Sequence, residues 1–266
     1  METPRLQTDG ISKVFRGLGG AGSQDVNALE GIDIEAGAGE FVSIVGPSGC
    51  GKSTLFNILA GLIEPTGGRV LLDGNPTDKL LGVFGYMPQK DLLMPWRTVL
   101  NNTTLGLEIA GMSRRAARAR ALADFPRFGL VGFEHAWPMS LSGGMRQRAA
   151  LLRTFLAGRD VMLLDEPFGA LDALTRQEMQ SWLLEIWQAD RKTIVFVTHD
   201  VEEAVYLSDR VYVLSGRPGH VVMQVEIDLP RPRPPAVSLT ARFIELKQRL
   251  LEPLFASPYT PVGAPS

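Results

Sequence analysis

The feature that most constrains the fold of this chain is a glycine-rich segment, Gly46 to Thr54, with the sequence GPSGCGKST. It fits the pattern G-x-x-x-x-G-K-[ST], whose glycines let backbone N–H groups turn inward around phosphate oxygens. A run of strand length, Phe41 to Val45, precedes it, and a stretch with helical spacing, Lys52 to Leu62, follows it. A strand, a tight loop and a helix in this order predict a phosphate-binding loop in an α/β domain.

The residue types in this loop are suited to binding a nucleoside triphosphate. Lys52 can reach the β- and γ-phosphates, and the hydroxyl of Ser53 can ligate Mg²⁺. Cys50 stands at a free position of the pattern, so its thiol is assigned no chemistry. The loop residues expected to line the nucleotide are Gly46, Pro47, Ser48, Gly49, Cys50, Gly51, Lys52, Ser53 and Thr54.

Strand-like and helix-like segments alternate along much of the chain. Val161 to Asp165 and Thr193 to Thr198 are apolar or β-branched runs of strand length, which favours a largely parallel sheet. Residues from about 90 to 150 carry few strand signals and contain the helical pattern Ser113 to Phe125, so we expect an inserted helical lobe. Arg16 to Asp25 is glycine-rich and polar and is predicted to be an exposed loop.

The C-terminal part of the chain differs from the rest. The strand-like sequence VVMQVEI leads into Pro230 to Pro235, which is expected to be extended. Leu239 to Phe255 has the spacing of one amphipathic helix, with Phe243, Leu246, Leu250 and Leu251 on one face. This tail is too short for a second regulatory domain, so we expect residues 226–266 to form only a short extension.

Two carboxylates and a histidine follow predicted buried strands. Asp165 ends one strand, where it suits a Mg²⁺ ligand, and the adjacent Glu166 can polarise an attacking water. His199 ends the strand TIVFVTHD. Because parallel strands present their carboxyl ends at one crevice, His199 is expected to face the same phosphate.

A second anion site is predicted at residues 141–148, LSGGMRQR. The hydroxyl of Ser142 and the backbone amides of Gly143 and Gly144 stand just ahead of a predicted helix, where N–H groups and the helix dipole favour an anion. Two half-sites for one triphosphate in a single chain suggest a dimer that closes over its nucleotide.

The bulk properties exclude several classes of protein. A formal net charge of −2 gives no global basic field for nucleic acid, and the arginines of Ser113 to Phe125 are interpreted as a solvated helix face. A single cysteine excludes an internal disulfide and fits a reducing compartment. The first ten residues lack the apolar core of a secretory signal. No apolar run approaches the roughly 20 residues of a membrane-spanning helix.

Taken together, these motifs resemble those of the ATP-binding subunits of ABC transporters, over about residues 9 to 220. GPSGCGKST is similar to the Walker A motif, LSGGMRQR to the ABC signature, and VMLLDEP to Walker B with its catalytic glutamate. The resemblance implies a P-loop NTPase (RecA-like) core with a mixed, largely parallel sheet, an inserted α-helical subdomain and an antiparallel β region near the N-terminus. We therefore expect an ATPase domain over residues 1–225, with the helical subdomain at about 90–158.

The resemblance also implies roles for further residues. Gln89 falls at the Q-loop, as a metal ligand and relay, Asp172 at the D-loop, and His199 at the switch histidine. Phe15 falls at the position that stacks on adenine, although it could equally fill a strand face. ATP and Mg²⁺ are the implied cofactors, with Glu166, His199, Lys52 and Gln89 acting in catalysis.

A finer resemblance is to nitrate/sulfonate/taurine-type importers. It is carried by LLMPW at residues 92–96, DEPFGALDALT at 165–175, THDVEEA at 198–204 and Pro218-Gly219. It implies a homodimer at the cytoplasmic face of the inner membrane, two integral-membrane permease subunits and a solute-binding protein, with no nucleic acid. The solute is expected to be a small anion or organic nutrient, with a thiamine-precursor pyrimidine as another candidate.

Two alternatives stay open from the sequence. The apolar side chains of Leu92 to Trp96 either dock on a membrane subunit or belong to the core of the helical lobe. The chain could also be a soluble ABC-type ATPase that is not coupled to transport, although such proteins usually carry two ATPase units or long coiled coils.

Overall fold

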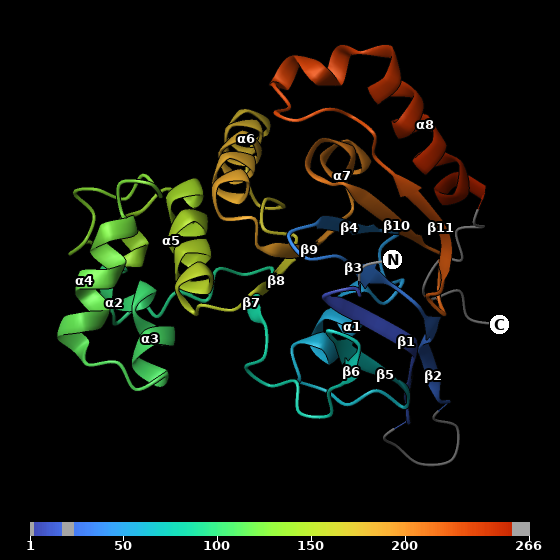
Figure 1. Cartoon of the computed structure of the whole chain (residues 1–266), viewed down its shortest axis with the longest axis horizontal. Coiled ribbons are helices and arrows are strands. Elements are labelled where there is room, and N and C mark those ends of the chain that lie inside the picture. Colours follow the sequence, from blue (N-terminus) through green and yellow to red (C-terminus); the bar gives the residue numbers. More distant parts are fainter. Residues whose placement is uncertain (1–2, 18–23, 257–266) are drawn as a thin grey trace.

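The computed structural model describes residues 3–17 and 24–256, which form two sheets, helices that cover them, and a group of helices at one end (Figure 1). In the larger sheet, four parallel pairings join five strands, and one antiparallel pairing adds an edge strand. Its strands, in order across the sheet, are β11 (Val221–Glu226), β10 (Arg210–Leu214), β4 (Phe41–Val45), β9 (Thr193–Thr198), β8 (Val161–Asp165) and β7 (Gly85–Met87).

The central strands of this sheet are buried along their whole lengths, as their continuous apolar sequences predict. Successive side chains point to opposite faces: Phe41 and Val45 join one core cluster, whereas Val42 and Ile44 join the other. The bounds predicted for β4, β8 and β9 are confirmed. The sheet therefore has helices on one face and a second layer on the other, with an apolar core in each gap.

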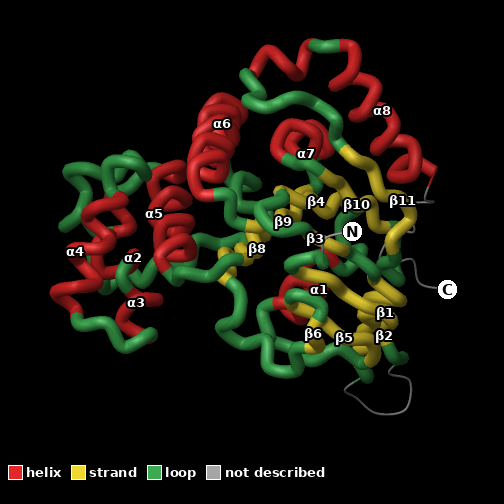
Figure 2. The backbone as a smooth tube through the Cα atoms, viewed as in Figure 1, coloured by secondary structure: helices red, strands yellow, loops and turns green. Residues whose placement is uncertain are grey.

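The second sheet is antiparallel and lies against the face that also carries α1 (Figure 2). This confirms the antiparallel β region predicted near the N-terminus. The central part of the predicted loop at 16–25 lies outside the described residues. The strands are β1 (Leu6–Phe15), β2 (Val26–Ile32), β5 (Gly67–Leu72) and β6 (Asn75–Pro76), with β3 (Glu35–Ala36) also pairing with β1.

The helix after the phosphate loop is shorter than predicted. α1 (Lys52–Leu59) ends three residues before Leu62, because the chain turns through Gly61, whose φ is +72°. Leu62 consequently leaves the apolar face of the helix and is 56% exposed. The helical prediction was therefore wrong for its last turn.

Four helices form a lobe beside the sheets, on the left of Figure 1. Their apolar side chains join the cluster that also covers β8 and β9, so the lobe is packed on the sheet through α5. Ser113 caps α4 by accepting a hydrogen bond from the Ala116 amide, which explains where that predicted helix begins. The helices are α2 (Val99–Thr103), α3 (Leu105–Ile109), α4 (Arg114–Asp124) and α5 (Gly143–Leu156). The 3-10 turn η1 (Pro138–Ser140) lies between α4 and α5.

The outer face of the larger sheet is covered by α6 (Ala173–Asp190), α7 (Val201–Leu207) and α8 (Ala241–Ala256). The amphipathic pattern of α8 is confirmed, since Phe243, Leu246 and Leu250 are buried. The extended conformation predicted for the proline-rich tail is only partly correct. The chain bends at Arg231 and Pro232 and enters a 3-10 turn, η2 (Pro235–Leu239).

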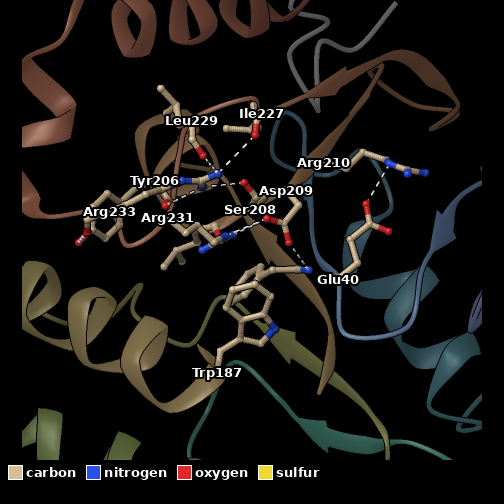
Figure 3. Close-up of polar contacts among 12 residues, drawn as sticks. Glu40, Trp187, Tyr206, Ser208, Asp209, Arg210, Ile227, Leu229, Arg231 and Arg233 are labelled. Carbon is tan, nitrogen blue, oxygen red and sulfur yellow. Dashed lines mark hydrogen bonds and ion pairs between the residues drawn. The ribbon is translucent and has the colours of Figure 1, made fainter. Parts of the chain in front are cut away.

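Two arginines of the tail attach it to the end of α7 (Figure 3). The buried Arg233 guanidinium donates to the carbonyls of Val205, Tyr206 and Ser208 through Nη1, and to those of Ile227 and Leu229 through Nη2. Burial, reinforced by the charge of Arg231, lowers the pKa of Arg233 to about 10.

Arg231 makes the second attachment. It donates to Asp209 Oδ1 at 2.9 Å and lies over the Trp187 ring, 4.2 Å from the ring centroid. Asp209 in turn accepts from the Phe41 amide at the start of β4. Arg231 and Arg233 therefore attach the proline-rich tail to α7 and to the larger sheet.

Replacing Arg233 by Met should reduce the free energy of unfolding by about 3 kcal/mol, because buried carbonyl groups lose their charged donor. Urea unfolding measures the change. The matched control is Arg242→Met, which removes an exposed ion pair with Asp228 and should cost within about 0.5 kcal/mol. Equal effects of the two substitutions would contradict the assigned anchoring role.

Candidate functional site

Parallel pairing brings the predicted polar groups to one edge of the larger sheet. Val45 pairs with Thr198, and Asp165 pairs with Val197, so β4, β9 and β8 end side by side. The phosphate loop follows β4, His199 follows β9, and Glu166 follows β8. Residues far apart in sequence therefore meet at the carboxyl edge of the sheet, as expected for an α/β nucleotide site.

The loop at 46–54 wraps around the N-terminus of α1. Gly51 has a φ of +103°, and a Cβ there would lie 2.5 Å from Leu29 Cδ2, so only glycine fits against β2. Lys52 is the first residue of α1, and its ammonium donates to the carbonyl oxygens of Gly46 at 2.7 Å and Pro47 at 3.1 Å. These contacts hold the cation inside the loop, at the positive end of the helix.

A pocket of about 450 Å³ opens above this loop. Most of the predicted loop residues line it, together with the predicted Phe15, Gln89, Glu166 and His199. Its lining residues are Phe15, Ala28, Ser48, Gly49, Gly51, Lys52, Ser53, Thr54, Gln89, Glu166, His199 and Arg217.

Gly46, Pro47 and Cys50 do not line the pocket, but the carbonyl groups of Gly46 and Pro47 accept hydrogen bonds from the Lys52 ammonium. The Cys50 side chain is buried, and burial raises the pKa of its thiol. This agrees with the absence of any chemistry assigned to it.

Phe15 is 42% exposed at the rim of the pocket. Its side chain does not fill the buried face of β1, so the structure favours the interpretation in which the ring is open to a ligand. The Lys13 ammonium lies 5.2 Å from the ring centroid.

Asp165 lies at the end of β8, beneath the pocket, and is 4% exposed. Burial raises its pKa to about 6, with a further contribution from Glu166, whereas Lys52 lowers it. No hydrogen bond to its carboxylate forms within the part of the chain that the structure describes. The Asp165 carboxylate and the Ser53 hydroxyl, neither of which forms a side-chain hydrogen bond with a described residue, are the hard oxygen ligands that Mg²⁺ prefers. The residues present therefore fit this ion, which would complete its shell with phosphate and water oxygens.

Glu166 is the centre of a small polar cluster. Its Oε2 accepts a hydrogen bond from Gln89 Nε2 at 3.1 Å and lies 3.3 Å from His199 Nδ1. Its backbone has a φ of +43°, a conformation that costs a non-glycine residue free energy, and its amide donates to Val197 O. The strained backbone directs the carboxylate into the pocket, where it can polarise a water molecule.

Four other predicted contact residues lie outside this pocket. Ser142 caps α5 by accepting from the Met145 amide, and Gly143 and Gly144 form the first turn of that helix. Asp172 caps α6 in the same way by accepting from the Thr175 amide. Each helix start is well formed, but neither contributes to the pocket of its own chain.

The segment after Gln89 is bonded to α5. Arg153 donates to the carbonyls of Asp91 and Leu92, and Arg146 lies 3.3 Å from the Asp91 carboxylate. The apolar side chains that follow divide between the two interpretations. Leu93 is buried in the lobe, whereas Leu92 and Trp96 are 60% and 73% exposed.

Two residues that line the pocket were not predicted from the sequence. Ala28 lies on β2, and its signal is no more than a small residue in a strand. Arg217 lies in the turn between β10 and β11, directly before the Pro218-Gly219 pair that forms part of the resemblance to importers. A cationic residue next to a fixed turn was the available signal.

The fold and site define a phosphate-loop ATPase, and comparison with known proteins gives the family. The sequence model of the ABC transporter family matches residues 29–169, and the chain belongs to this family as an ATP-hydrolysing subunit.

The chain is 46% identical over 247 residues to the uncharacterized ABC transporter ATP-binding protein MJ0412 of Methanocaldococcus jannaschii, covering 93% of this chain and 90% of that protein. It is 43% identical to the taurine import ATP-binding protein TauB of Rhizobium johnstonii, covering 85% of each.

Among solved structures, the chain resembles the dimeric structure of MJ0796, a bacterial ABC transporter cassette, with a TM-score of 0.73 and 32% identity. The match covers 85% of this chain and 100% of that one. A post-hydrolysis dimer of the same cassette, bound to ADP and Pi, gives the same values. These relatives confirm the predicted P-loop NTPase fold and the resemblance to ABC subunits of the taurine importer type.

A buried carboxyl beside the site should make stability depend on pH. Glu203 on α7 is 5% exposed and accepts from Gln180 Nε2, and burial raises its pKa to about 6 from an ordinary value of 4.5. Because the folded state holds this proton more tightly, the contribution is largest below pH 4.5 and is lost as the pH rises through 6.

The neutral variant Glu203→Gln does not titrate, so its free energy of unfolding does not decrease through this group as the pH rises. Its stability relative to the wild type should therefore rise by about 1 kcal/mol between pH 5 and pH 8. Urea unfolding of both proteins across that range measures the difference. A difference that stays constant with pH would show that Glu203 does not titrate with a raised pKa.

Proposed function

We propose that the chain is the ATP-binding and ATP-hydrolysing subunit that powers solute import by an ABC transporter. The observation that carries this proposal is the likeness to a protein named for taurine import over 85% of both chains. The solute class favoured is a small organic or inorganic anion of the taurine, sulfonate or nitrate type. A thiamine-precursor pyrimidine is the second candidate.

The proposed assembly has two copies of this chain paired head to tail. Each ATP would lie between the phosphate loop of one copy and Ser142 to Gly144 of the other. This arrangement is supported by the position of Ser142 at an exposed helix start outside its own pocket, and by the dimeric cassette with the same fold. The N-terminus of α5 in one copy and the N-terminus of α1 in the other would then both lie at the triphosphate.

In the proposed mechanism, Lys52 and the loop amides bind the β- and γ-phosphates. Asp165 and Ser53 would hold Mg²⁺, with Gln89 as a further ligand, and the ion would offset phosphate charge when bound. The Glu166 carboxylate accepts a proton from a water molecule as the oxygen of that water attacks the γ-phosphorus. The bond from that phosphorus to the bridging oxygen breaks and leaves ADP and phosphate. His199 orients the transferring group, and Asp172 steadies the partner copy.

The same proposal gives the chain its location and partners. The structure has no helix in its described residues that is long and apolar enough to span a bilayer. We propose that the dimer binds the cytoplasmic face of two integral-membrane permease subunits, which receive solute from a solute-binding protein. The exposed Leu92 and Trp96, close in sequence to Gln89, would supply the apolar contact. No nucleic acid takes part.

Glu166→Gln should retain ATP binding and lose at least about 100-fold in turnover, because the amide cannot accept the proton of water. ATP should then hold the purified variant as a dimer, measured by size-exclusion chromatography with light scattering. Adding Ser142→Arg should return it to a monomer if the signature residues close the shared site. Near-normal turnover of Glu166→Gln would remove the assigned role.

Coupling to a permease can be tested by purifying the tagged chain from membranes of its native host. Polytopic membrane proteins should accompany the wild type and should be lost from the double variant Leu92→Asp, Trp96→Asp, since charges in an apolar contact prevent docking. The matched control is Leu239→Asp, at an 81% exposed leucine of the tail. Recovery of ribosomes or nucleic acid in place of membrane proteins would favour a soluble ABC-type ATPase.

A further inference from the structure

The turn between β10 and β11 lies beside the phosphate loop. β10 runs parallel to β4, and Val213 pairs with Val45, so the residues after Leu214 emerge next to the start of the loop. A Cβ on Gly46 would stand 3.1 Å from the Leu214 carbonyl oxygen, which shows how closely the two segments approach. This turn belongs to the same edge of the sheet as the nucleotide pocket.

The turn is fixed on three sides. The Gly219 amide donates to Ala28 O at 3.0 Å, and Gly219 O accepts from the Glu30 amide at 2.9 Å, which joins the turn to β2. A Cβ on Gly219 would lie 2.0 Å from Cys50 O, so the backbones of the turn and the phosphate loop are in direct contact. Ser215 Oγ closes the turn from inside, donating to Pro218 O and accepting from the His220 amide.

This fixed turn presents Arg217 to the pocket. Its side chain is exposed and lines the same space as Phe15, Ala28 and the phosphate loop. Within residues 3–17 and 24–256, its guanidinium forms no hydrogen bond or ion pair. Lys52, the other permanent cation of the pocket lining, is already bound to loop carbonyls. Arg217 therefore has a positioned backbone and a guanidinium that is free to bind a ligand.

The order of the strands decides which part of a nucleotide Arg217 meets. The groups suited to hydrolysis follow β9, β8 and β7, on one side of the phosphate loop. Arg217 follows β10, on the other side, where β2 and Phe15 close the pocket. The end that holds Arg217 is thus the end away from the γ-phosphate.

We propose that Arg217 binds the nucleoside end of ATP. This inference rests on the proposed use of the pocket as the ATP site. A guanidinium is flat, so it can stack on the purine while Phe15 provides an apolar surface, and its N–H groups can donate to base or ribose oxygen and nitrogen acceptors. Arg217 contributes to nucleotide affinity in this way and takes no part in the attack on the γ-phosphate.

The test compares two ligands of the purified full-length chain by isothermal titration. ADP carries the nucleoside and is not hydrolysed, whereas inorganic tripolyphosphate carries phosphate alone. Arg217→Ala should weaken ADP binding about tenfold and leave tripolyphosphate binding within about twofold. Arg217→Lys should weaken ADP binding nearly as much as Arg217→Ala, because lysine keeps the positive charge but lacks the planar guanidinium. In ATPase assays, Arg217→Ala should raise KM and leave kcat unchanged.

Two controls separate the possible failures. Arg115→Ala, at an exposed arginine of α4 far from the pocket lining, should leave both affinities unchanged. Lys52→Met should weaken both ligands. If Lys52→Met has no effect, the pocket is not the ATP site and the proposed function fails. If Lys52→Met weakens binding but Arg217→Ala does not, or reduces both ligands equally, the nucleoside assignment of Arg217 is wrong.

Discussion

The pairing of β4 with β9, and of β9 with β8, is the constraint on which the site depends. In this register Val45, Thr198 and Asp165 end together, and the next residues of each strand form the site. Because side chains alternate across a sheet, a slip of one residue would turn Asp165 to the opposite face and would exchange the apolar side chains of that strand between the two cores. The two apolar cores, one on each face of the sheet, therefore determine the strand register and with it the positions of the site residues.

Two aspartates at opposite edges of the larger sheet have carboxylates in different surroundings. Asp209 accepts from the Phe41 amide and from Arg231, so its carboxylate is satisfied within the protein. Asp165 is buried at the opposite edge of the same sheet, where no described residue donates a hydrogen bond to its carboxylate, and burial raises its pKa to about 6. An unpaired buried carboxylate is costly unless a ligand compensates it. This contrast separates a residue that holds the domain together from one that suits a cation.

The sequence was informative where structure is local, and less so where distant segments meet. The strands around the site and the start of α4 follow from continuous apolar runs and a serine cap, and their predicted positions are correct. A last turn of α1 up to Leu62 was wrongly predicted, because Leu62 keeps the helical spacing although the helix ends at Leu59 and the chain turns at Gly61. Arg217 lines a pocket formed by segments far away in sequence, and Arg233 donates to carbonyl groups at the end of α7; no periodicity reveals either position. Leu92 and Leu93 have identical side chains, and only packing decides which one is exposed.

The contacts around Gln89 connect the pocket with the helix that carries the signature residues. Gln89 donates to Glu166, and two residues later Asp91 binds Arg146 and Arg153 of α5 through its carboxylate and its carbonyl. The Arg153 side chain is largely buried, and burial lowers its pKa, so its bonds to the Asp91 and Leu92 carbonyls compensate a desolvated charge. Moving this segment away from α5 would leave that charge without its acceptors. The segment after Gln89 and α5 are therefore held as one unit, and the exposed Leu92 and Trp96 belong to the same unit.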